Sequence, residues 1–351
     1  MALLIDNDAA ERLLTMDDAL AAIESVFSQL GDGQANFYPL QQLVSPTAAE
    51  GDAYVWGHHV GAVRDPPRLA FRFKSDVTQW IEQDGNTTRE KFNVEPGTFM
   101  GFILLFDAET GELLGLMNDG VVQHVRVGAS AGVACDLFAR EDADTVGLLG
   151  SGGMAEVYLE AFAEVRDLSS VRVYSPTEEN REAFAAEMSE ELGIDVEAVD
   201  DPEAAVRDAG IVSTCTDASQ PVIEDEWLDD GAFLTNVRAI EIPDDVIAGA
   251  DRCYATTNEA YETRLLGTEE ERAELAERAG HGDHDTAFPT LGDVLTGRDE
   301  GRASDDETIY FDNRAVGIQF AAVGDLVYER ALEQELGVEV PLSWFQQTMR
   351  N

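Results

Sequence analysis

The segment from Thr145 to Ala155 constrains the fold of this chain more than any other stretch. It reads Thr-Val-Gly-Leu-Leu-Gly-Ser-Gly-Gly-Met-Ala, a short apolar run followed by a glycine turn and the start of a helix. Gly150 permits a tight turn, and Gly152 lets the backbone approach a pyrophosphate closely. The free N–H groups at the start of the helix favour phosphate binding. The spacing predicts a dinucleotide-binding unit, with a ligand-free glycine turn as the alternative.

A second expected strand, 171–174, bears on which dinucleotide binds. An acidic residue at its end would bind the adenosine 2′-hydroxyl and favour NAD. The chain instead continues with Ser175, Pro176 and Thr177. The two hydroxyl groups can bind a 2′-phosphate, with Arg172 or Arg181 nearby, so NAD and NADP both stay open and NADP is favoured. The residues predicted to contact the cofactor are Gly150, Ser151, Gly152, Gly153, Met154, Ala155, Ser175, Thr177, Thr214 and Thr216.

The chain changes its hydrophobic pattern near residue 140. Before that point, residues 36–80 alternate in the manner of antiparallel strands, and 16–30 and 121–139 have helical spacing. After it, strands are predicted at 146–150, 171–174, 196–199, 211–214, 232–237 and 252–256, with a helix over 176–192 capped by Ser175. This order predicts an α/β fold, a Rossmann-type doubly wound parallel sheet over 126–309. It is inserted in a split α+β domain formed by 1–125 and 310–351, which a last helix over 318–336 completes.

The charge balance restricts partners and surroundings. The chain has 351 residues and a formal net charge of -47, with 70 acidic and 23 basic residues. Such a charge argues against nucleic acid and anionic membrane surfaces as partners. It is typical of proteins adapted to high salt, where the Debye length falls to about 3 Å at 1 M. No signal peptide or membrane span is expected, and three dispersed cysteines fit a reducing compartment. The expected location is the cytoplasm.

Lysine usage directs attention to one predicted strand. The 23 basic residues comprise 21 arginines and only two lysines, Lys74 and Lys91. On a strand, Arg72 and Lys74 point to one face and the flanking phenylalanines to the other. A retained lysine indicates a position where a compact ammonium cannot be replaced by a guanidinium. Chance retention on the surface is the alternative for both lysines.

Arg126 is a second candidate for chemistry. It lies near the start of a helix of small apolar residues, in Gln-His-Val-Arg-Val-Gly-Ala. There it is either a surface charge or a buried receptor that binds a substrate carboxylate in two-point fashion. His124, two residues away, is interpreted as a packed or capping histidine, with a proton donor as the alternative. The segment 262–285 is predicted to be a solvated acidic helix and loop, and His281 and His284 within it are interpreted as exposed loop residues, so no metal site is predicted.

Several motifs together resemble one family. They are Phe73-Lys74, residues 105–113, His124 to Ala129, the glycine turn, residues 171–177, residues 211–216, Leu291 to Gly297, Gly301-Arg302 and residues 305–311. Jointly they resemble the ornithine cyclodeaminase, archaeal alanine dehydrogenase and mu-crystallin family, over about residues 70 to 335. The resemblance implies a nicotinamide cofactor, an α-amino or α-imino acid substrate and a homodimer. It also implies that Lys74 is the substrate lysine and that Arg126 binds the substrate carboxylate.

The sequence departs from the family pattern in three places. The loop after the fifth strand lacks the aspartate of the cyclodeaminases, and Glu241, the nearest acid, is the candidate catalytic residue there. The segment 39–42 lacks an expected arginine, which Arg64, Arg68 or Arg72 could replace, and Phe320 stands where aspartate is common. These differences favour a cytoplasmic NAD(P)-dependent oxidoreductase of small α-amino or α-imino acids. The alternatives are an ornithine cyclodeaminase and a cofactor-binding protein without turnover, like mu-crystallin.

Overall fold

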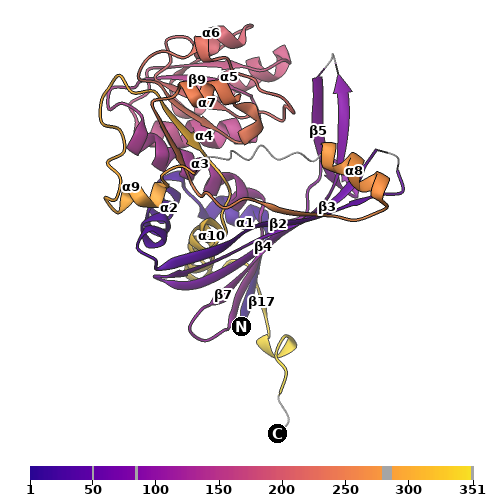
Figure 1. The fold of residues 1–351 in the computed structure, drawn as a ribbon. Helices are drawn as coiled ribbons and strands as arrows, with labels where there is room; N and C mark the ends of the chain where they lie inside the picture. Colours follow the sequence, from indigo (N-terminus) through magenta and orange to yellow (C-terminus); the bar gives the residue numbers. More distant parts are fainter. Residues whose placement is uncertain (50, 84–85, 279–286, 349–351) are drawn as a thin grey trace.

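The computed structural model describes residues 1–49, 51–83, 86–278 and 287–348, and two β-sheets organise it (Figure 1). The first sheet is entirely parallel and has seven strands in the order β11-β10-β9-β12-β13-β16-β14. These strands are β9 Thr145–Leu149, β10 Ser170–Tyr174, β11 Asp195–Ala198, β12 Ile211–Thr214, β13 Phe233–Asn236, β14 Arg252–Ala255 and β16 Ile309–Asp312. The helices between them are α4 Gly153–Val165, α5 Glu178–Leu192, α6 Pro202–Val206 and α7 Asp244–Gly249. The predicted doubly wound α/β fold is confirmed.

The second sheet has ten strands and runs β15-β2-β3-β4-β7-β8-β1-β17, with β5 and β6 added beside β4. Its strands are β1 Ala2–Ile5, β2 Ala35–Pro46, β3 Ala53–Arg64, β4 Pro67–Gln83, β5 Asn86–Asn93, β6 Glu95–Pro96, β7 Gly101–Asp107, β8 Leu113–Asn118, β15 Glu262–Leu265 and β17 Val338–Val340. Burial alternates residue by residue along β3, because successive side chains point to opposite faces. One face of this sheet is therefore buried.

Helices cover that buried face and join the two sheets. They are α1 Asn7–Leu13, α2 Met16–Gly31, α3 Gly120–Phe138, α9 Leu291–Leu295 and α10 Gly317–Glu333. The start of α10 lies directly against β3, since a Cβ on Gly61 or on Gly317 would collide with the backbone of the other. This close approach brings α10 next to β4, the strand that carries both Arg72 and Lys74. Short 3₁₀ turns at Asp225–Trp227, Ala239–Glu241 and Leu342–Trp344 complete the chain.

The structure differs from the sequence predictions in three respects. Residues 262–265 form strand β15, which pairs with β2, and only 269–278 form a helix, α8 Glu269–Arg278. Helix α5 begins at Glu178 with Thr177 as its N-cap, so Ser175 does not cap it. Strand β16 extends the parallel sheet to residue 312. Both strand differences are long-range pairings that local sequence does not encode. The proposed divisions at 125/126 and 309/310 stay predictions, and His281 and His284 lie outside the described residues.

Across the described ranges, no helix combines the length and the apolar character that crossing a bilayer requires.

Candidate active site

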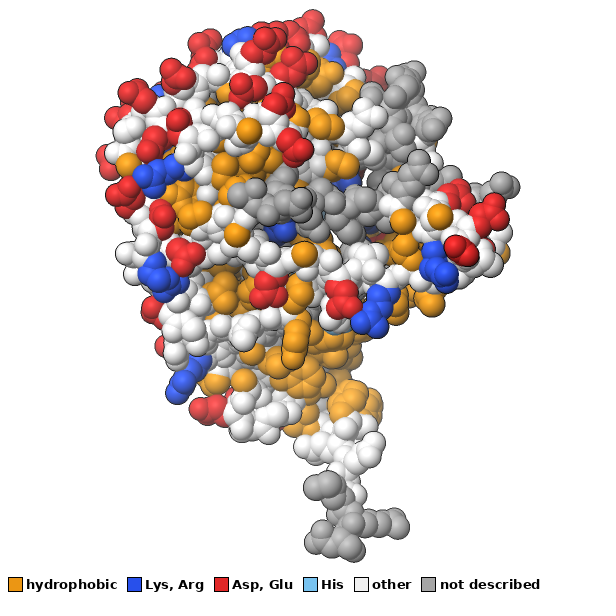
Figure 2. All heavy atoms as spheres, viewed as in Figure 1, with side chains coloured by type: hydrophobic (Ala, Val, Ile, Leu, Met, Phe, Trp, Pro, Cys, Tyr) orange, Lys and Arg blue, Asp and Glu red, His pale blue; other side chains and the backbone are white. Residues whose placement is uncertain are grey.

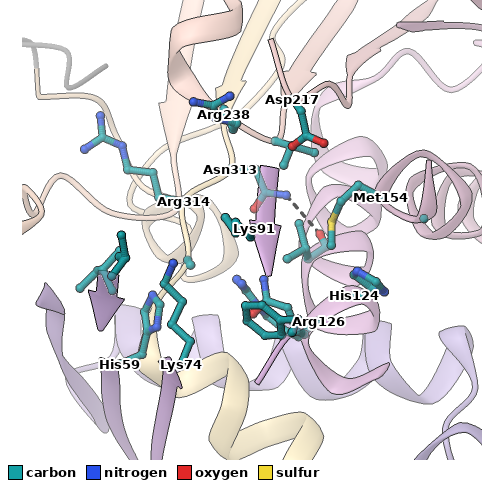
Figure 3. Close-up of a pocket in the computed structure, with 18 of the residues that line it drawn as sticks. His59, Lys74, Lys91, His124, Arg126, Met154, Asp217, Arg238, Asn313 and Arg314 are labelled. Atoms are coloured by element: carbon teal, nitrogen blue, oxygen red, sulfur yellow. Dashed lines mark hydrogen bonds between the residues drawn. The ribbon is translucent and has the colours of Figure 1, made fainter. Parts of the chain in front are cut away.

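A cavity of about 790 Å³ lies between the two sheets and brings half of the predicted site residues together (Figure 3). One wall contains Gly152, Gly153 and Met154 of the glycine turn and Thr216, which follows β12. The opposite sheet contributes the predicted substrate residues Arg72 and Lys74, and α3 contributes Arg126. Ligands of doubly wound sheets bind beyond the carboxyl ends of the strands, where the strand order reverses. The cavity lies at this point, between β9 and β12.

The glycine turn has the shape that a pyrophosphate requires. Gly150 adopts a φ of +115°, in the region that favours glycine, and a Cβ there would collide with the carbonyl of Cys215. Gly152 is the N-cap of α4, no side chain caps this helix, and a Cβ on Gly152 would meet no atom within 4 Å. Ala155 is fully buried where helix and strand pack. Open space in front of uncapped N–H groups fits a dinucleotide, which would supply hydride transfer chemistry at its nicotinamide.

Replacing Gly152 with valine tests this assignment. The backbone of Gly152 has an ordinary extended conformation with φ of -112°, so a side chain should be accepted without loss of the fold. The valine would occupy the space in front of the helix, and we expect NAD(P)H affinity to fall at least about tenfold while the melting temperature changes little. Gly152→Ala should give a smaller loss. Unchanged affinity of the folded valine variant in a fluorescence titration would refute the cofactor site.

Ser151, Ser175 and Thr177 lie next to the turn but outside the cavity lining. The Ser151 hydroxyl donates to Oγ of Ser175 at 2.8 Å, and a guanidinium nitrogen of Arg181 donates to the Ser175 carbonyl at 3.1 Å. Arg172 is engaged elsewhere, because it donates to the carbonyl of Arg207. Arg181 is therefore the arginine placed beside the end of β10.

Arg126 is buried in the cavity wall. It is 3% exposed, and its Nη1 donates to the neutral Oε1 of Gln319 at 2.8 Å. Its Nε has no hydrogen-bond partner, and among the described residues no carboxylate lies within ion-pair distance of it. Burial and the nearby charge of Arg72 lower the pKa of Arg126 to about 9. A buried cation without a compensating acid has the electrostatics of an anion receptor.

Arg72 and Lys74 also line the cavity, but each has a buried carboxylate beside it. Arg72 Nε donates to Asp119 Oδ2 at 2.6 Å, and both side chains are almost completely buried. Lys74 Nζ lies 3.5 Å from Asp76 Oδ2 on the same strand. Asp119 and Asp76 hold these two cations in place and neutralise most of the charge of Arg72 and Lys74. Arg72 and Lys74 lie on one face of β4, as predicted from the alternation.

His59 is a site residue that sequence reasoning did not find, and Phe320, noted in the sequence only as a departure from the family pattern, lies against two cations of the site. The Phe320 ring lies 4.7 Å from the guanidinium carbon of Arg126 and 5.5 Å from that of Arg72, within cation–π distance. The His59 ring lies 5.4 Å from the Phe320 ring, and neither of its nitrogens has a hydrogen-bond partner among the described residues. Burial, followed by the neighbouring cations, lowers the pKa of His59 well below its usual value, so the imidazole is neutral. Figure 3 shows His59 beside Lys74, with Arg126 across the cavity.

Glu241 lies behind the cavity wall and not in its lining. The side chain is fully buried, and burial raises its pKa. Its carboxylate accepts from the backbone and hydroxyl of Thr216, both at 2.6 Å, and from the Arg238 backbone at 2.9 Å. Thr214 adds a fourth, longer bond at 3.2 Å. Glu241 therefore ties the loops after β12 and β13 together. Its catalytic role stays a prediction.

Two further observations complete the site. His124 lines the cavity beside Gly153, and burial lowers its pKa. Within the described ranges, no group of three or more His, Cys, Asp or Glu side chains is arranged to hold a metal ion.

The fold and the cavity define a Rossmann-type protein in which a dinucleotide cradle faces a cationic pocket for a small acid. The family model that matches residues 70–335 is that of the ornithine cyclodeaminase/mu-crystallin family. The chain belongs to this family, which confirms the resemblance found in the sequence. The family and its members are NAD(P)-dependent enzymes, as that resemblance implied.

Relatives of this chain carry several different names. It is 32% identical over 250 residues to a Delta(1)-pyrroline-2-carboxylate reductase of Bacillus cereus, covering 69% of this chain and 74% of the relative. It is 26% identical to the alanine dehydrogenase of Archaeoglobus fulgidus, covering 96% and 98%. Among solved structures, Thermococcus litoralis Delta(1)-pyrroline-2-carboxylate reductase in complex with NADH and L-proline aligns with a TM-score of 0.78 at 24% identity, covering 96% of this chain and 100% of the other. This last similarity concerns the fold.

Proposed function

We propose that this protein is an NAD(P)-dependent oxidoreductase that interconverts a small α-imino acid and the corresponding α-amino acid. A nicotinamide cofactor held at Gly152 and Gly153 would supply hydride to the α-carbon of the imine, and the imine nitrogen would take up a proton. Arg126 binds the substrate carboxylate. Lys74 stabilises charge or relays a proton at the reacting centre.

The observation that carries this proposal is the burial of the Arg126 guanidinium without a carboxylate partner among the described residues. Its guanidinium is buried, lines the cavity and has no carboxylate partner in the part of the chain that the structure describes, whereas Arg72 and Lys74 each have one. Keeping such a cation uncompensated is costly unless a bound anion completes it. A substrate carboxylate does so, and a guanidinium can bind it through two parallel hydrogen bonds. The glycine turn lines the same cavity, which supports binding of this carboxylate next to the nicotinamide of a cofactor held there.

Both alternative functions have weaker support in the geometry. A cyclodeaminase needs an acid aimed at the substrate after the fifth strand, and Glu241 is committed to its threonine and backbone partners there. Asp217 follows β12 and is the one acidic residue among the described lining residues. A cofactor-binding protein without turnover does not require Arg126 and Lys74 to converge on one cavity.

An absorbance assay separates the three functions. The protein is incubated in molar KCl with a panel of α-amino acids and oxidised cofactor, or of α-keto acids, ammonium and reduced cofactor. Net change in reduced nicotinamide supports the oxidoreductase. Proline and ammonia from ornithine without net change would show a cyclodeaminase, and cofactor binding without turnover would show a binding protein.

We also propose a preference for NADP over NAD. Ser175 and Thr177 replace the acidic residue that would repel a 2′-phosphate, and Arg181 is held beside Ser175. A charge-assisted contact to the phosphate should give NADPH an affinity about three- to tenfold above that of NADH. Comparing the two dissociation constants checks this. Arg181→Met should remove the difference, and a clear preference of the unaltered protein for NADH would contradict it.

The outer face of the ten-stranded sheet is the surface through which we propose that the chain dimerises. This face carries partly exposed aromatic side chains in mutual contact, from Trp56 and His58 on β3 through Phe71 and Phe73 on β4 to Phe102 on β7. Figure 2 shows hydrophobic side chains gathered over the lower part of the molecule, where the sheet lies. A patch of this kind is a favourable protein–protein contact. The cytoplasmic location stays part of the proposal.

High salt should be required for stability. Figure 2 shows acidic side chains crowded over the Rossmann part, and the net charge of -47 makes self-repulsion severe when screening is weak. Lowering KCl from molar to 0.01 M lengthens the Debye length from about 3 Å to about 30 Å. We expect the melting temperature to fall by roughly 10 °C or more, with dissociation or unfolding. Calorimetry and light scattering across a KCl series measure both, and a salt-independent melting temperature would refute adaptation to salt.

A further inference from the structure

The two lysines of this chain lie in the same cavity. The sequence contains Lys74 and Lys91 as its only lysines beside 21 arginines. The cavity is lined by 32 described residues of the 351, and both lysines are among them. The function proposed above uses Lys74 and gives no task to Lys91. A chain that uses arginine everywhere else has thus kept two compact ammonium groups in one pocket, which points to two tasks there.

Strand pairing fixes how the two lysines are arranged. Lys91 lies on β5 directly opposite Thr78 of β4, and cross-strand partners share a face of the sheet. Thr78 follows Lys74 by four residues and therefore lies on the same face, about 13 Å further along the strand. Thr78 is 2% exposed and also lines the cavity. The cavity consequently extends along β4, from the reacting centre at Lys74 to a second polar end at Lys91.

The far end differs in chemistry from the cofactor end. Trp80 and Val55 add a ring and aliphatic groups to this stretch of the cavity, whereas the amide of Gln42 lies in the row of Lys74, across Gly57 of β3. Asp217, the acidic residue in the described lining, follows β12 on the cofactor side. Asp76 lies between Lys74 and Thr78 on the same face of β4, and its carboxylate is paired with Lys74. A hydroxyl and an ammonium on one apolar-walled surface form a donor set for a carboxylate.

We propose that Lys91, with Thr78, binds a second acidic group of the substrate, so that the natural substrate is a dicarboxylic α-imino or α-amino acid. This inference rests on the proposed function. Arg126 binds the α-carboxylate, Lys74 serves the reacting centre, and Lys91 binds the distal carboxylate. The site then selects its substrate by charge at both ends of the molecule.

Matched acids test this proposal. Glutarate and pentanoate have the same chain length and differ in one carboxylate, and neither can react with the cofactor. In calorimetric titrations at one fixed KCl concentration with NADP(H) bound, glutarate should bind at least about tenfold more tightly than pentanoate. Lys91→Met should abolish the tighter binding of glutarate, and Lys91→Arg should retain part of it. The control Arg12→Met, on the exposed surface, should leave it unchanged. Thr78→Val gives a second, uncharged variant that should weaken glutarate alone.

Turnover distinguishes failure of this inference from failure of the proposed function. With ammonium and reduced cofactor, 2-oxoglutarate should be used with a higher kcat/KM than 2-oxopentanoate. If the two keto acids are reduced equally well, and glutarate and pentanoate bind equally tightly, the role of Lys91 is wrong while the proposed reductase function still holds. Equal losses for both probes in Lys91→Met would also overturn it, since they would indicate a structural lysine. If neither probe binds and no keto acid is reduced, both proposals are wrong.

Discussion

Arg126→Met is expected to lower kcat/KM for the α-imino acid by roughly two to three orders of magnitude, since it leaves the substrate carboxylate buried and unpaired. NAD(P)H affinity should change little, because the cradle at Gly152 is formed by backbone. The same substitution should leave the free protein at least as stable as before. It removes a buried cation that lies against the Phe320 ring and that has no carboxylate partner within the described ranges.

The Arg126→Met variant is informative because its activity should fall while its stability stays the same or rises. A merely structural arginine would lose stability and activity together. Arg126→Lys keeps the charge but not the two-point geometry, so it should raise KM more than it lowers kcat. Arg12→Met, on the surface, changes the net charge by the same amount and serves as the control. Loss of cofactor binding in Arg126→Met would contradict the assigned role.

Lys74→Met is expected to lower kcat by about a hundredfold or more, the usual effect of losing a preorganised charge at a reacting centre. Its stem lies against the backbone of Gly57, and its ammonium lies beside Asp76, so the group is held in place. Lys74→Arg retains the charge in a different shape and should also damage kcat more than cofactor affinity. Steady-state kinetics together with NADPH titration give both quantities. A kcat within twofold of the unaltered enzyme would exclude Lys74 from the chemistry.

The parts of the site that the sequence predicts are those encoded locally. The glycine turn needs only a strand, a spacing and a helix in succession, so Gly150, Gly152 and Ala155 take the places that the motif assigns. Strand alternation likewise suffices to put Arg72 and Lys74 on one face. Helical periodicity around Arg126 indicates a buried segment, although it cannot say what the guanidinium faces.

The remaining parts depend on contacts between distant segments. Phe320 reaches Arg126 because α10 docks on β3 through the Gly61–Gly317 approach, which no periodicity reveals. Strand β15 joins β2 across more than two hundred residues, and its four-residue sequence is too short and polar to indicate a strand. The hydrogen-bonding role of Glu241 depends on the meeting of two loops. The charge balance of the cavity could therefore not be derived from sequence.

Transfer of deuterium from the cofactor to the product tests the central claim most directly. The enzyme is given NADPH deuterated on the transferring face of C4, ammonium and 2-oxoglutarate in molar KCl, and the amino acid is analysed by mass spectrometry. The account predicts one deuterium at the α-carbon for each NADPH consumed, and loss of this product in the Arg126→Met variant. Cofactor that binds but is not consumed, across the dicarboxylic and monocarboxylic keto acids alike, would contradict it.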